Sequence, residues 1–173
     1  MNILGRNVTL RAIEASDLPL LHQWANDPEI QSKLVGWHFP TSMRDQERWL
    51  ESLSCTSLHQ RFANLVDIDW KSRCAFHGMM LGDLDIRGKG YGRDSIMAIM
   101  RYAFQDLGLN RLDGAMLENN DASIHVYTKK CGWVIEGRSR ARLYRNGRFL
   151  DRVDVGVIRS DYEKLIATTD YWN

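Results

Sequence analysis

The apolar positions of the chain follow strand spacing in some segments and helix spacing in others. From residue 91 to residue 107 they recur every three to four positions, which predicts a long helix that Gly108 ends. Val153, Val155 and Val157 alternate with other residues, as in a strand with one buried face. The same patterns predict strands at 8–13, 61–70, 72–81, 111–117, 133–144 and 148–158, and helices at about 17–26, 42–53 and 121–130.

The order of these segments predicts the fold class. Strands interleaved with helices favour an α/β protein whose central sheet is mixed, mostly antiparallel, and covered by helices on both faces. Asn146-Gly147 lies between the last two predicted strands and is a strong hairpin signal. The 173 residues contain no repeat and no Pro/Gly/Ser-rich linker, so we expect a single domain over 1–173.

Composition narrows the class of protein. Hydrophobic residues make up 44% of the chain and charged residues 26%, and no stretch approaches the about 20 apolar residues that span a membrane. The first six residues contain no apolar core of a signal peptide, and the three cysteines match no zinc motif, so we expect a cytoplasmic protein with reduced thiols. The net charge of +1 argues against nucleic acid or membrane partners, and the arginines between 138 and 152 are most simply a solvated strand face.

The segment before the long helix carries the most specific chemistry. Residues 87–93 read Arg-Gly-Lys-Gly-Tyr-Gly-Arg, and a helix that begins here can hold a phosphate with its free N–H groups and its positive dipole end. A Walker loop needs Ser or Thr after its Gly-Lys pair, whereas Gly90 follows Gly88-Lys89 here. A dinucleotide fingerprint lies near the first βα turn of a parallel unit, whereas this segment lies past the middle of the chain. From this segment alone, a glycine-rich connector that binds no ligand is an equally open interpretation.

Two motifs together resemble the GNAT superfamily of N-acetyltransferases. Arg87-x-x-Gly90-x-Gly92 is similar to that family's pyrophosphate loop, and Asn120 to Tyr127 followed by Gly132-Trp133 is similar to its Asn-x-x-Ser/Ala-Ile-x-x-Tyr segment and the Gly-Phe after it. The resemblance covers residues 8–162 and is closest to the branch that contains ribosomal-protein and spermidine acetyltransferases. Two departures stand out. The segment from Tyr127 to Gly132 is one residue longer than usual, so we expect a distorted helix end, and the region 61–67 is shorter than the family's hairpin.

The resemblance implies acetyl-CoA as co-substrate, no metal, and transfer of an acetyl group to a primary amine. A non-catalytic module that senses acyl-CoA is the alternative. The cofactor-binding residues it implies are Met80, Leu81, Arg87, Gly88, Lys89, Gly90, Tyr91, Gly92, Asn120 and Ser123. From the sequence alone, the pair Met79-Met80 is more typical of a core.

Tyr127 and His77 are the candidate catalytic residues. Asn120, Ser123 and Tyr127 share one helical face, and by resemblance Tyr127 is the acid that protonates the leaving thiolate. A core tyrosine with a satisfied hydroxyl is the alternative. The family's glutamate base matches Phe76 here, and the adjacent His77 has a suitable pKa but faces the other side of the strand, so a structural histidine or a water relay stays open.

The acceptor amine is left open by the sequence. Trp37, His38 and Phe39 lie between the first two helices, where the family's acceptor site has a wall, although both aromatic residues suit a core equally well. A polyamine would favour the acidic residues 45, 47 and 51, a nucleotide-linked amino sugar would favour the arginines from 138 to 142, and a protein N-terminus is the third class. A homodimer is compatible with all three.

Overall fold

The structure, a computed structural model, describes residues 2–36, 39–52, 58–59, 63–82 and 87–173. Its helical segments are η1 (Ala15–Asp17), α1 (Leu18–Ala25), α2 (Pro28–Gln31), α3 (Met43–Ser52), α4 (Tyr91–Arg101), η3 (Tyr102–Asp106), α5 (Asp121–His125), η4 (Val126–Lys130) and α6 (Arg159–Thr169). Its strands are β1 (Ile3–Leu4), β2 (Thr9–Leu10), β3 (Leu58–His59), β4 (Ala63–Asp69), β5 (Cys74–Met79), β6 (Arg111–Leu117), β7 (Val134–Arg145) and β8 (Arg148–Ile158).

The described strands form a central sheet and a small separate pair. The central sheet has the order β3-β4-β5-β6-β8-β7, and β1 pairs with β2 apart from it. Only the neighbours β5 and β6 run parallel, whereas every other pair is antiparallel. The predicted mixed, mostly antiparallel sheet is therefore confirmed.

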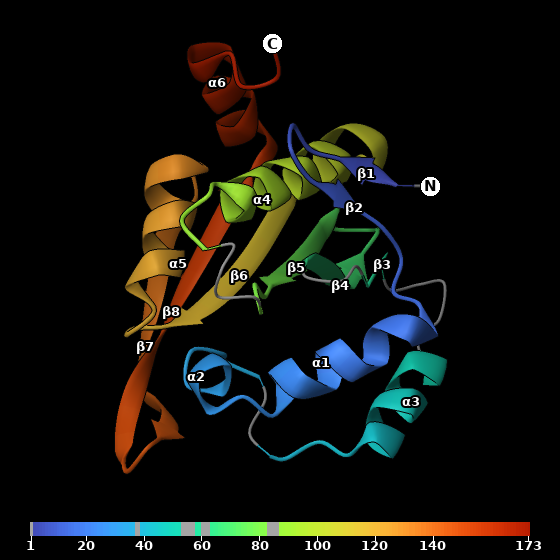
Figure 1. Cartoon of the computed structure of the whole chain (residues 1–173). Helices are drawn as coiled ribbons and strands as arrows, with labels where there is room; N and C mark the ends of the chain where they lie inside the picture. The colour runs from blue at the N-terminus through green and yellow to red at the C-terminus, as the bar shows by residue number, and fades with distance from the viewer. Residues whose placement is uncertain (1, 37–38, 53–57, 60–62, 83–86) are drawn as a thin grey trace.

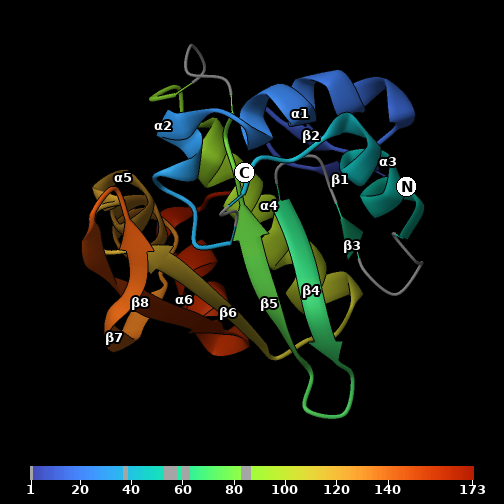
Figure 2. The same ribbon diagram turned by 90° about the horizontal axis from the view of Figure 1, so that it is seen from below.

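Two hydrophobic cores hold the helices against the sheet. The main core joins the buried face of α4, including Ile96 and Met100, to Leu112 of β6 and to the alternating valines of β8. A smaller core joins α1, α2 and α3 through residues such as Leu21 and Trp24. In Figure 1 these three helices lie below the sheet and α4 lies above it; seen from below in Figure 2, α4 lies behind β4 and β5, whereas α1 and α3 lie beside one end of these strands. The predicted sheet flanked by helices is thus confirmed.

Most predicted segments are present, with corrections at the two ends of the chain. The segment predicted as a strand at 8–13 contains the two residues of β2, which pair with the equally short β1, and an isolated bridge residue, Ala12. The pattern did not predict β1, the helix α6, or the four-residue α2, which Asp27 caps by accepting hydrogen bonds from the N–H groups of Glu29 and Ile30. In the short hairpin region, β4 pairs with β5 on one side, and on the other side the described residues of β3 pair with it at two positions.

The extra residue between Tyr127 and Gly132 is absorbed by a π turn. The helix α5 continues as the π-helical segment η4, and the backbone N–H of Trp133 donates to the carbonyl of Tyr127 at 3.1 Å. A π turn is the usual form of a single insertion in a helix and is frequent at functional sites. The predicted distortion of this helix end is thus confirmed, and it falls at the candidate catalytic tyrosine.

Asp94 joins both ends of the described chain to the first turns of α4. Its carboxylate is 3% exposed and accepts hydrogen bonds from the backbone N–H groups of Arg6, Asn7 and Val8 at 2.6–3.0 Å. The hydroxyl of Tyr171 donates to the same carboxylate at 2.8 Å. A buried carboxylate with four donors near a helix N-terminus is electrostatically well placed.

Candidate active site

The site is created by the separation of β5 from β6. The two parallel strands pair only from Cys74 opposite Arg111 to Phe76 opposite Asp113, and no pairing continues beyond those positions. The residues that follow, from His77 to Met79 on β5 and from Gly114 to Met116 on β6, line a cavity together with residues of α5 and η4. Separated strand edges present free backbone N–H and C=O groups, so an extended ligand can pair with them as an added strand does.

Tyr127 lies in this cavity on the π turn of η4. Its side chain is 5% exposed, and its ring packs edge-on against Trp133 at 5.0 Å between centroids. Burial raises the pKa of the Tyr127 hydroxyl, so the proton stays on the oxygen throughout the neutral range. The geometry therefore offers a protonated donor on a buried side chain that lines the cavity.

His77 faces the same cavity, with its ring 5.8 Å from that of Tyr127. The side chain is 2% exposed, and its Nδ1 lies 2.9 Å from the backbone carbonyl oxygen of Asn64. Because a carbonyl only accepts, Nδ1 carries the proton and Nε2 carries a lone pair. Nε2 is buried and has no hydrogen-bond partner among the described residues, and burial lowers the pKa of His77 to about 4. The ring is thus neutral, with an acceptor atom that a ligand can satisfy.

The glycine-rich loop lies at the N-terminus of α4, as the sequence predicted. Gly88 and Gly90 have φ of +77° and +85°, a region where other residues are strained, and Gly90 is the N-cap of the helix. Residues 87–90 are exposed, and Arg87 forms an ion pair with Glu29 of α2 at 2.9 Å. The free N–H groups of the first helical turn thus lie at the surface, with Lys89 and Tyr91 beside them.

Of the other predicted cofactor residues, Asn120 and Ser123 line the cavity, whereas Met80 and Leu81 do not. Met79 lines it, Met80 packs into the small core around α1, and Leu81 lies against Gly92, so the core interpretation fits Met80 best. Asn120 and Ser123 line the cavity on the same helical face as Tyr127, which confirms that predicted spacing. The Asn120 side chain also caps α5, because its Oδ1 accepts from the Ser123 N–H at 3.3 Å.

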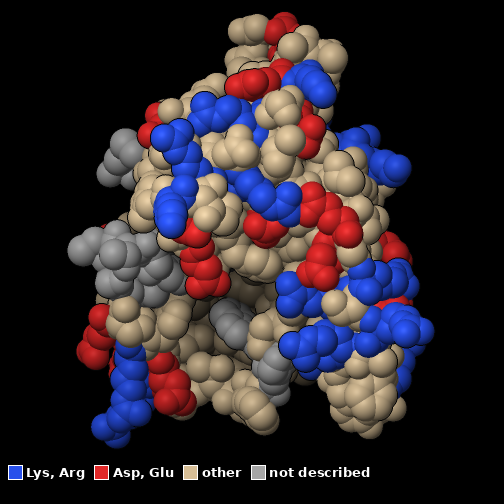
Figure 3. Space-filling model, turned by 180° about the vertical axis from the view of Figure 1, so that it is seen from behind, with Lys and Arg blue, Asp and Glu red and all other residues tan. Residues whose placement is uncertain are grey.

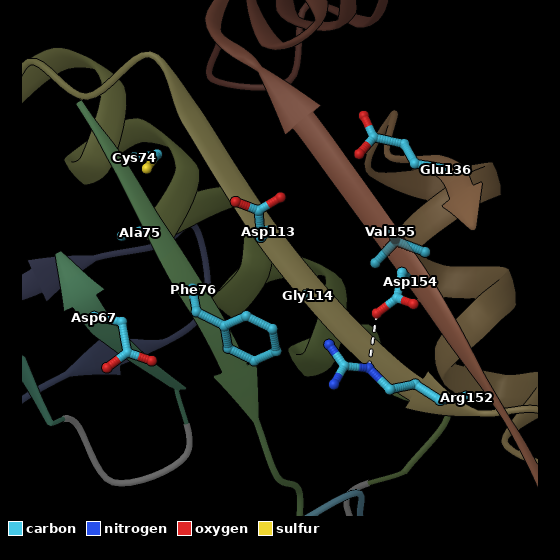
Figure 4. Close-up of a pocket in the computed structure, with 10 residues that line it drawn as sticks. All are labelled: Asp67, Cys74, Ala75, Phe76, Asp113, Gly114, Glu136, Arg152, Asp154 and Val155. Carbon is cyan, nitrogen blue, oxygen red and sulfur yellow. Dashed lines mark hydrogen bonds and ion pairs between the residues drawn. The ribbon is translucent and has the colours of Figure 1, made fainter. Parts of the chain in front are cut away.

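Phe76 and His77 face opposite sides of the sheet, as the strand period predicts. Phe76 lines a second hollow, of about 360 Å³, on the face turned away from Tyr127. Figure 4 shows its ring among acidic side chains and Arg152, whose guanidinium donates to Asp154 at 2.7 Å. The acidic residues are Asp67, Asp113, Glu136 and Asp154. Gly114 borders both hollows, so only a thin part of the sheet separates them.

The predicted acceptor loop is only partly described. Trp37 and His38 lie outside the described residues, whereas Phe39 is 78% exposed, which excludes a core role for that ring. The neighbouring residues 33–35 line the cavity opposite Tyr127. Sequence reasoning missed them, because a short Leu-Val pair flanked by Lys and Gly carries neither a period nor a motif.

Comparison with known proteins decides the family. The domain described as "Acetyltransferase (GNAT) domain" matches residues 7–134 of this chain. The chain belongs to the GNAT acetyltransferase family. It is therefore an acyltransferase that uses acetyl-CoA, and the family resemblance of its two motifs is confirmed.

Relatives of this GNAT acetyltransferase cover almost its whole length. The SPbeta prophage-derived uncharacterized N-acetyltransferase YokL of Bacillus subtilis is 25% identical over 169 residues, which cover 92% of this chain and 94% of that protein. The spermidine N(1)-acetyltransferase of Vibrio cholerae is 26% identical over 175 residues, which cover 92% and 97%. The crystal structure of the Vibrio cholerae spermidine N-acetyltransferase with CoA and spermine has the same fold, with a TM-score of 0.79, 24% identity and coverage of 89% and 96%.

The site of this GNAT acetyltransferase fits an acetyl-CoA molecule in three respects. The glycines with positive φ let the N–H groups at the start of α4 approach phosphates, and the separated strands β5 and β6 have backbone groups that can pair with amides. His77 Nε2 is an acceptor without a hydrogen-bond partner in the described chain. The described residues include no group of three or more His, Cys, Asp or Glu side chains placed to hold a metal ion. None of the described helices is long and apolar enough to cross a membrane.

Proposed function

We propose that this enzyme transfers the acetyl group of acetyl-CoA directly to a primary amine of a polyamine while both substrates are bound. One observation carries the proposal: a protonated Tyr127 and a neutral His77 line one cavity between β5 and β6. The next described helix after β5 is α4, whose glycine-rich N-terminus is of the type that binds phosphate. The thioester supplies the acetyl group, and the chain supplies binding, orientation and hydrogen bonds.

The cofactor is held mainly by backbone groups. We place the pyrophosphate at the N–H groups of the segment from Gly88 to Gly92, where helix dipole and glycines favour an anion. Arg87, Lys89 and Tyr91 border this position from the side. The backbone from Met79 to Leu81 is free of β6 and can pair with the amides of the pantetheine arm, while Asn120 and Ser123 border the arm from α5.

Tyr127 donates a hydrogen bond to the sulfur as the C–S bond breaks. A thiol has a pKa of about 8.5, so its thiolate needs stabilisation at neutral pH when it leaves. The buried hydroxyl keeps its proton, and a donor in a water-poor cavity interacts strongly with developing charge. The proton that the attacking nitrogen loses ends on the sulfur, so a neutral amine and a thioester give an amide and a thiol.

His77 accepts a hydrogen bond from the attacking amine. Its Nδ1–H is held by the Asn64 carbonyl, so Nε2 is fixed as the acceptor. With a pKa of about 4 the ring is neutral near pH 7, so its Nε2 keeps a lone pair for the amine. The buried surroundings disfavour a charged ammonium and therefore favour the neutral amine. The acceptor sheds its ammonium proton to solvent before it reaches Nε2.

The polyamine class is supported by the relatives. The Vibrio cholerae protein is named as a spermidine acetyltransferase, and its structure was obtained with spermine. In this chain the exposed residues Asp45, Glu47 and Glu51 of α3 provide negative charge for a polycation. We place the acceptor entrance at residues 33–36 and Phe39, and the predicted acceptor residues Trp37 and His38 lie outside the described residues.

We further propose that the enzyme acts in the cytoplasm as a homodimer and does not bind nucleic acid. Cys74 and Cys131 are free thiols in the described chain, as suits a reducing compartment. The overall charge of +1 gives no field that would attract nucleic acid. Light scattering on the purified protein tests the dimer directly.

The proposed reaction is tested by thiol release. Purified enzyme and acetyl-CoA are incubated with spermidine, with a peptide bearing a free N-terminus, and with an amino sugar, and released CoA thiol is measured. We expect turnover with spermidine to exceed that with the other two amines. A folded protein that binds acetyl-CoA but releases no thiol with any amine contradicts the proposed transfer, and turnover restricted to the peptide or the sugar contradicts only the polyamine class.

A further inference from the structure

A short loop after α2 forms the wall of the cavity that faces Tyr127. Its residues Lys33, Leu34 and Val35 line the cavity, and Gly36 follows them. Only one turn of helix precedes it, so the loop depends on contacts with distant parts of the chain. Leu34 packs into the small core around α1. Within the described residues, the loop's hydrogen bonds to distant segments come from the start of α5 and the end of β7.

The contact with α5 is made through Asn120 and the residue before it. The Asn120 Nδ2 donates to the carbonyl of Lys33 at 3.2 Å, and the Lys33 ammonium donates to the carbonyl of Asn119 at 2.9 Å. The other amide atom of Asn120 caps α5 by accepting from the Ser123 N–H. One side chain therefore links the helix that carries Tyr127 to the opposite wall of the same cavity.

The contact with β7 is made through Arg145, the last residue of that strand. Its Nη2 donates to the carbonyls of Leu34 and Val35 at 3.4 and 3.3 Å, across 110 and more residues of sequence. Figure 3 shows Lys and Arg side chains gathered on the side of the molecule that carries the β7–β8 hairpin. Among the hairpin arginines, Arg142 and Arg148 are exposed and donate no hydrogen bond to the loop in the described part of the chain.

We propose that Asn120 and Arg145 are positioning residues that hold loop 33–35 as the acceptor-side wall of the cavity and thereby set the affinity for the amine. This inference rests on the proposed function. Asn120 then has a positioning function on the acceptor side in addition to its contact with the cofactor arm. Neither side chain takes part in bond making. The loop they hold decides how closely an amine approaches the cavity, so loss of either contact weakens acceptor binding more than cofactor binding.

Two substitutions separate this function from general stability. Asn120→Asp keeps an oxygen to cap α5 but removes the donor to Lys33, and Asp caps helices as well as Asn does. Arg145→Ala removes the contact with Leu34 and Val35, and Arg145→Lys retains one charged donor. Arg142→Ala is the matched control, because it removes the same charge from the same hairpin. A net hydrogen bond corresponds to about a fivefold change in affinity.

The experiment has two arms. In the first, hydrogen exchange of the ligand-free enzyme is measured at residues 32–36 and at α5; we expect faster exchange in the loop for Asn120→Asp and Arg145→Ala, with α5 unchanged. In the second, kinetics with spermidine should show the acceptor KM raised about fivefold in both variants. In Arg145→Ala, which lies away from the cofactor arm, the acetyl-CoA KM and kcat should stay within about twofold of the parent. Arg145→Lys should lie in between, and Arg142→Ala should match the parent in both arms.

The outcomes distinguish this inference from the proposed function. Unchanged loop exchange in both variants, or equal increases in the two KM values of Arg145→Ala, overturns the positioning role. An effect of Arg142→Ala as large as that of Arg145→Ala also overturns it, because the cause would then be charge alone. A parent that does not acetylate spermidine contradicts the proposed acceptor class. The kinetics of the variants are then measured with the amine of the panel that the parent acetylates.

Discussion

The exposed loop before α4 and the buried cavity between β5 and β6 serve one ligand with different parts of the chain. In the loop, backbone conformation matters, because Gly88 and Gly90 adopt φ values that other residues avoid and the helix N–H groups face solvent. In the cavity, side chains and burial matter, since Tyr127 and His77 are each no more than 5% exposed and both have shifted pKa values.

This difference separates binding from chemistry. An exposed loop is screened by water and salt, so a single contact there changes affinity modestly. Buried groups interact in a medium of low dielectric constant, so removal of one polar atom has a large effect on rate or stability. Substitutions in the two regions should therefore differ in size and also in the quantity they change.

The largest effect is expected for Tyr127→Phe. The ring and its contact with Trp133 remain, but the donor to the leaving sulfur is lost, so kcat should fall about 100-fold or more while acetyl-CoA affinity changes little. Steady-state kinetics and calorimetry provide the two measurements. Tyr144→Phe, at an exposed tyrosine of the β7–β8 hairpin, is the control. A kcat within threefold of the parent would remove Tyr127 from the proposed role.

The next effect concerns acid stability and His77. Burial lowers the pKa of His77 to about 4 in the folded state, against about 6.5 when unfolded, so the unfolded state binds more protons between these values. The contribution of His77 to the free energy of unfolding is therefore fully present above pH 6.5 and is lost as the pH falls toward 4. Between pH 7 and pH 5 this loss is about 2 kcal/mol.

His77→Asn removes this dependence and keeps a donor for the Asn64 carbonyl. Urea unfolding at pH 7 and pH 5 should show that the parent loses about 2 kcal/mol more than the variant over this interval. His125→Asn, at an exposed histidine of α5, should behave like the parent. Equal losses in the parent and in His77→Asn would show that His77 is not the buried neutral group described.

On the exposed side, Gly90→Ala should weaken acetyl-CoA binding about tenfold, or ~1.4 kcal/mol. No atom lies within 4 Å of the position of the added Cβ, so the cause is the φ of +85° and not a clash. The strain shifts the loop away from the conformation that presents its N–H groups. Gly137→Ala, at a glycine without positive φ, is the control. Calorimetry that gives equal dissociation constants for the folded variant and the parent contradicts the loop's role.

The smallest effect is expected for Glu29→Gln. Glu29 pairs with Arg87 at the surface, and its loss frees the guanidinium for an anionic ligand. Acetyl-CoA should bind about twofold more tightly, and the gain should disappear at high salt, because the pair is exposed. Glu47→Gln, on α3, removes the same charge elsewhere. A gain that persists at high salt, or one shared by Glu47→Gln, would point to another cause.

The sequence predicted the features that are local and periodic. The long helix, the Asn146-Gly147 hairpin, the glycine-rich helix start and the shared face of Asn120, Ser123 and Tyr127 all follow from spacing or turn chemistry and are present in the structure. A single residue of excess length before Gly132 also indicated the irregular helix end that proved to be a π turn.

The sequence could not predict what depends on tertiary contacts. The pairing of β5 with β6 ends at Phe76 and Asp113, and no local sequence signal predicts that the two strands separate there. The tautomer of His77 is fixed by a carbonyl thirteen residues away, and loop 33–35 is held by side chains more than 80 residues distant. Burial and distant hydrogen bonds thus decide the chemistry at positions that spacing identified only as candidates.

The four hydrogen bonds to Asp94 form at different times during protein synthesis. Residues 6–8 precede Asp94 in the sequence and are available as soon as α4 emerges, whereas Tyr171 follows it by 77 residues. At about 5–20 residues per second, the tyrosine arrives about 4 to 15 seconds later. The helix that presents the glycine-rich loop therefore folds first with its anchor incomplete, and a nascent chain should acquire full affinity for acetyl-CoA only after Tyr171 has joined Asp94.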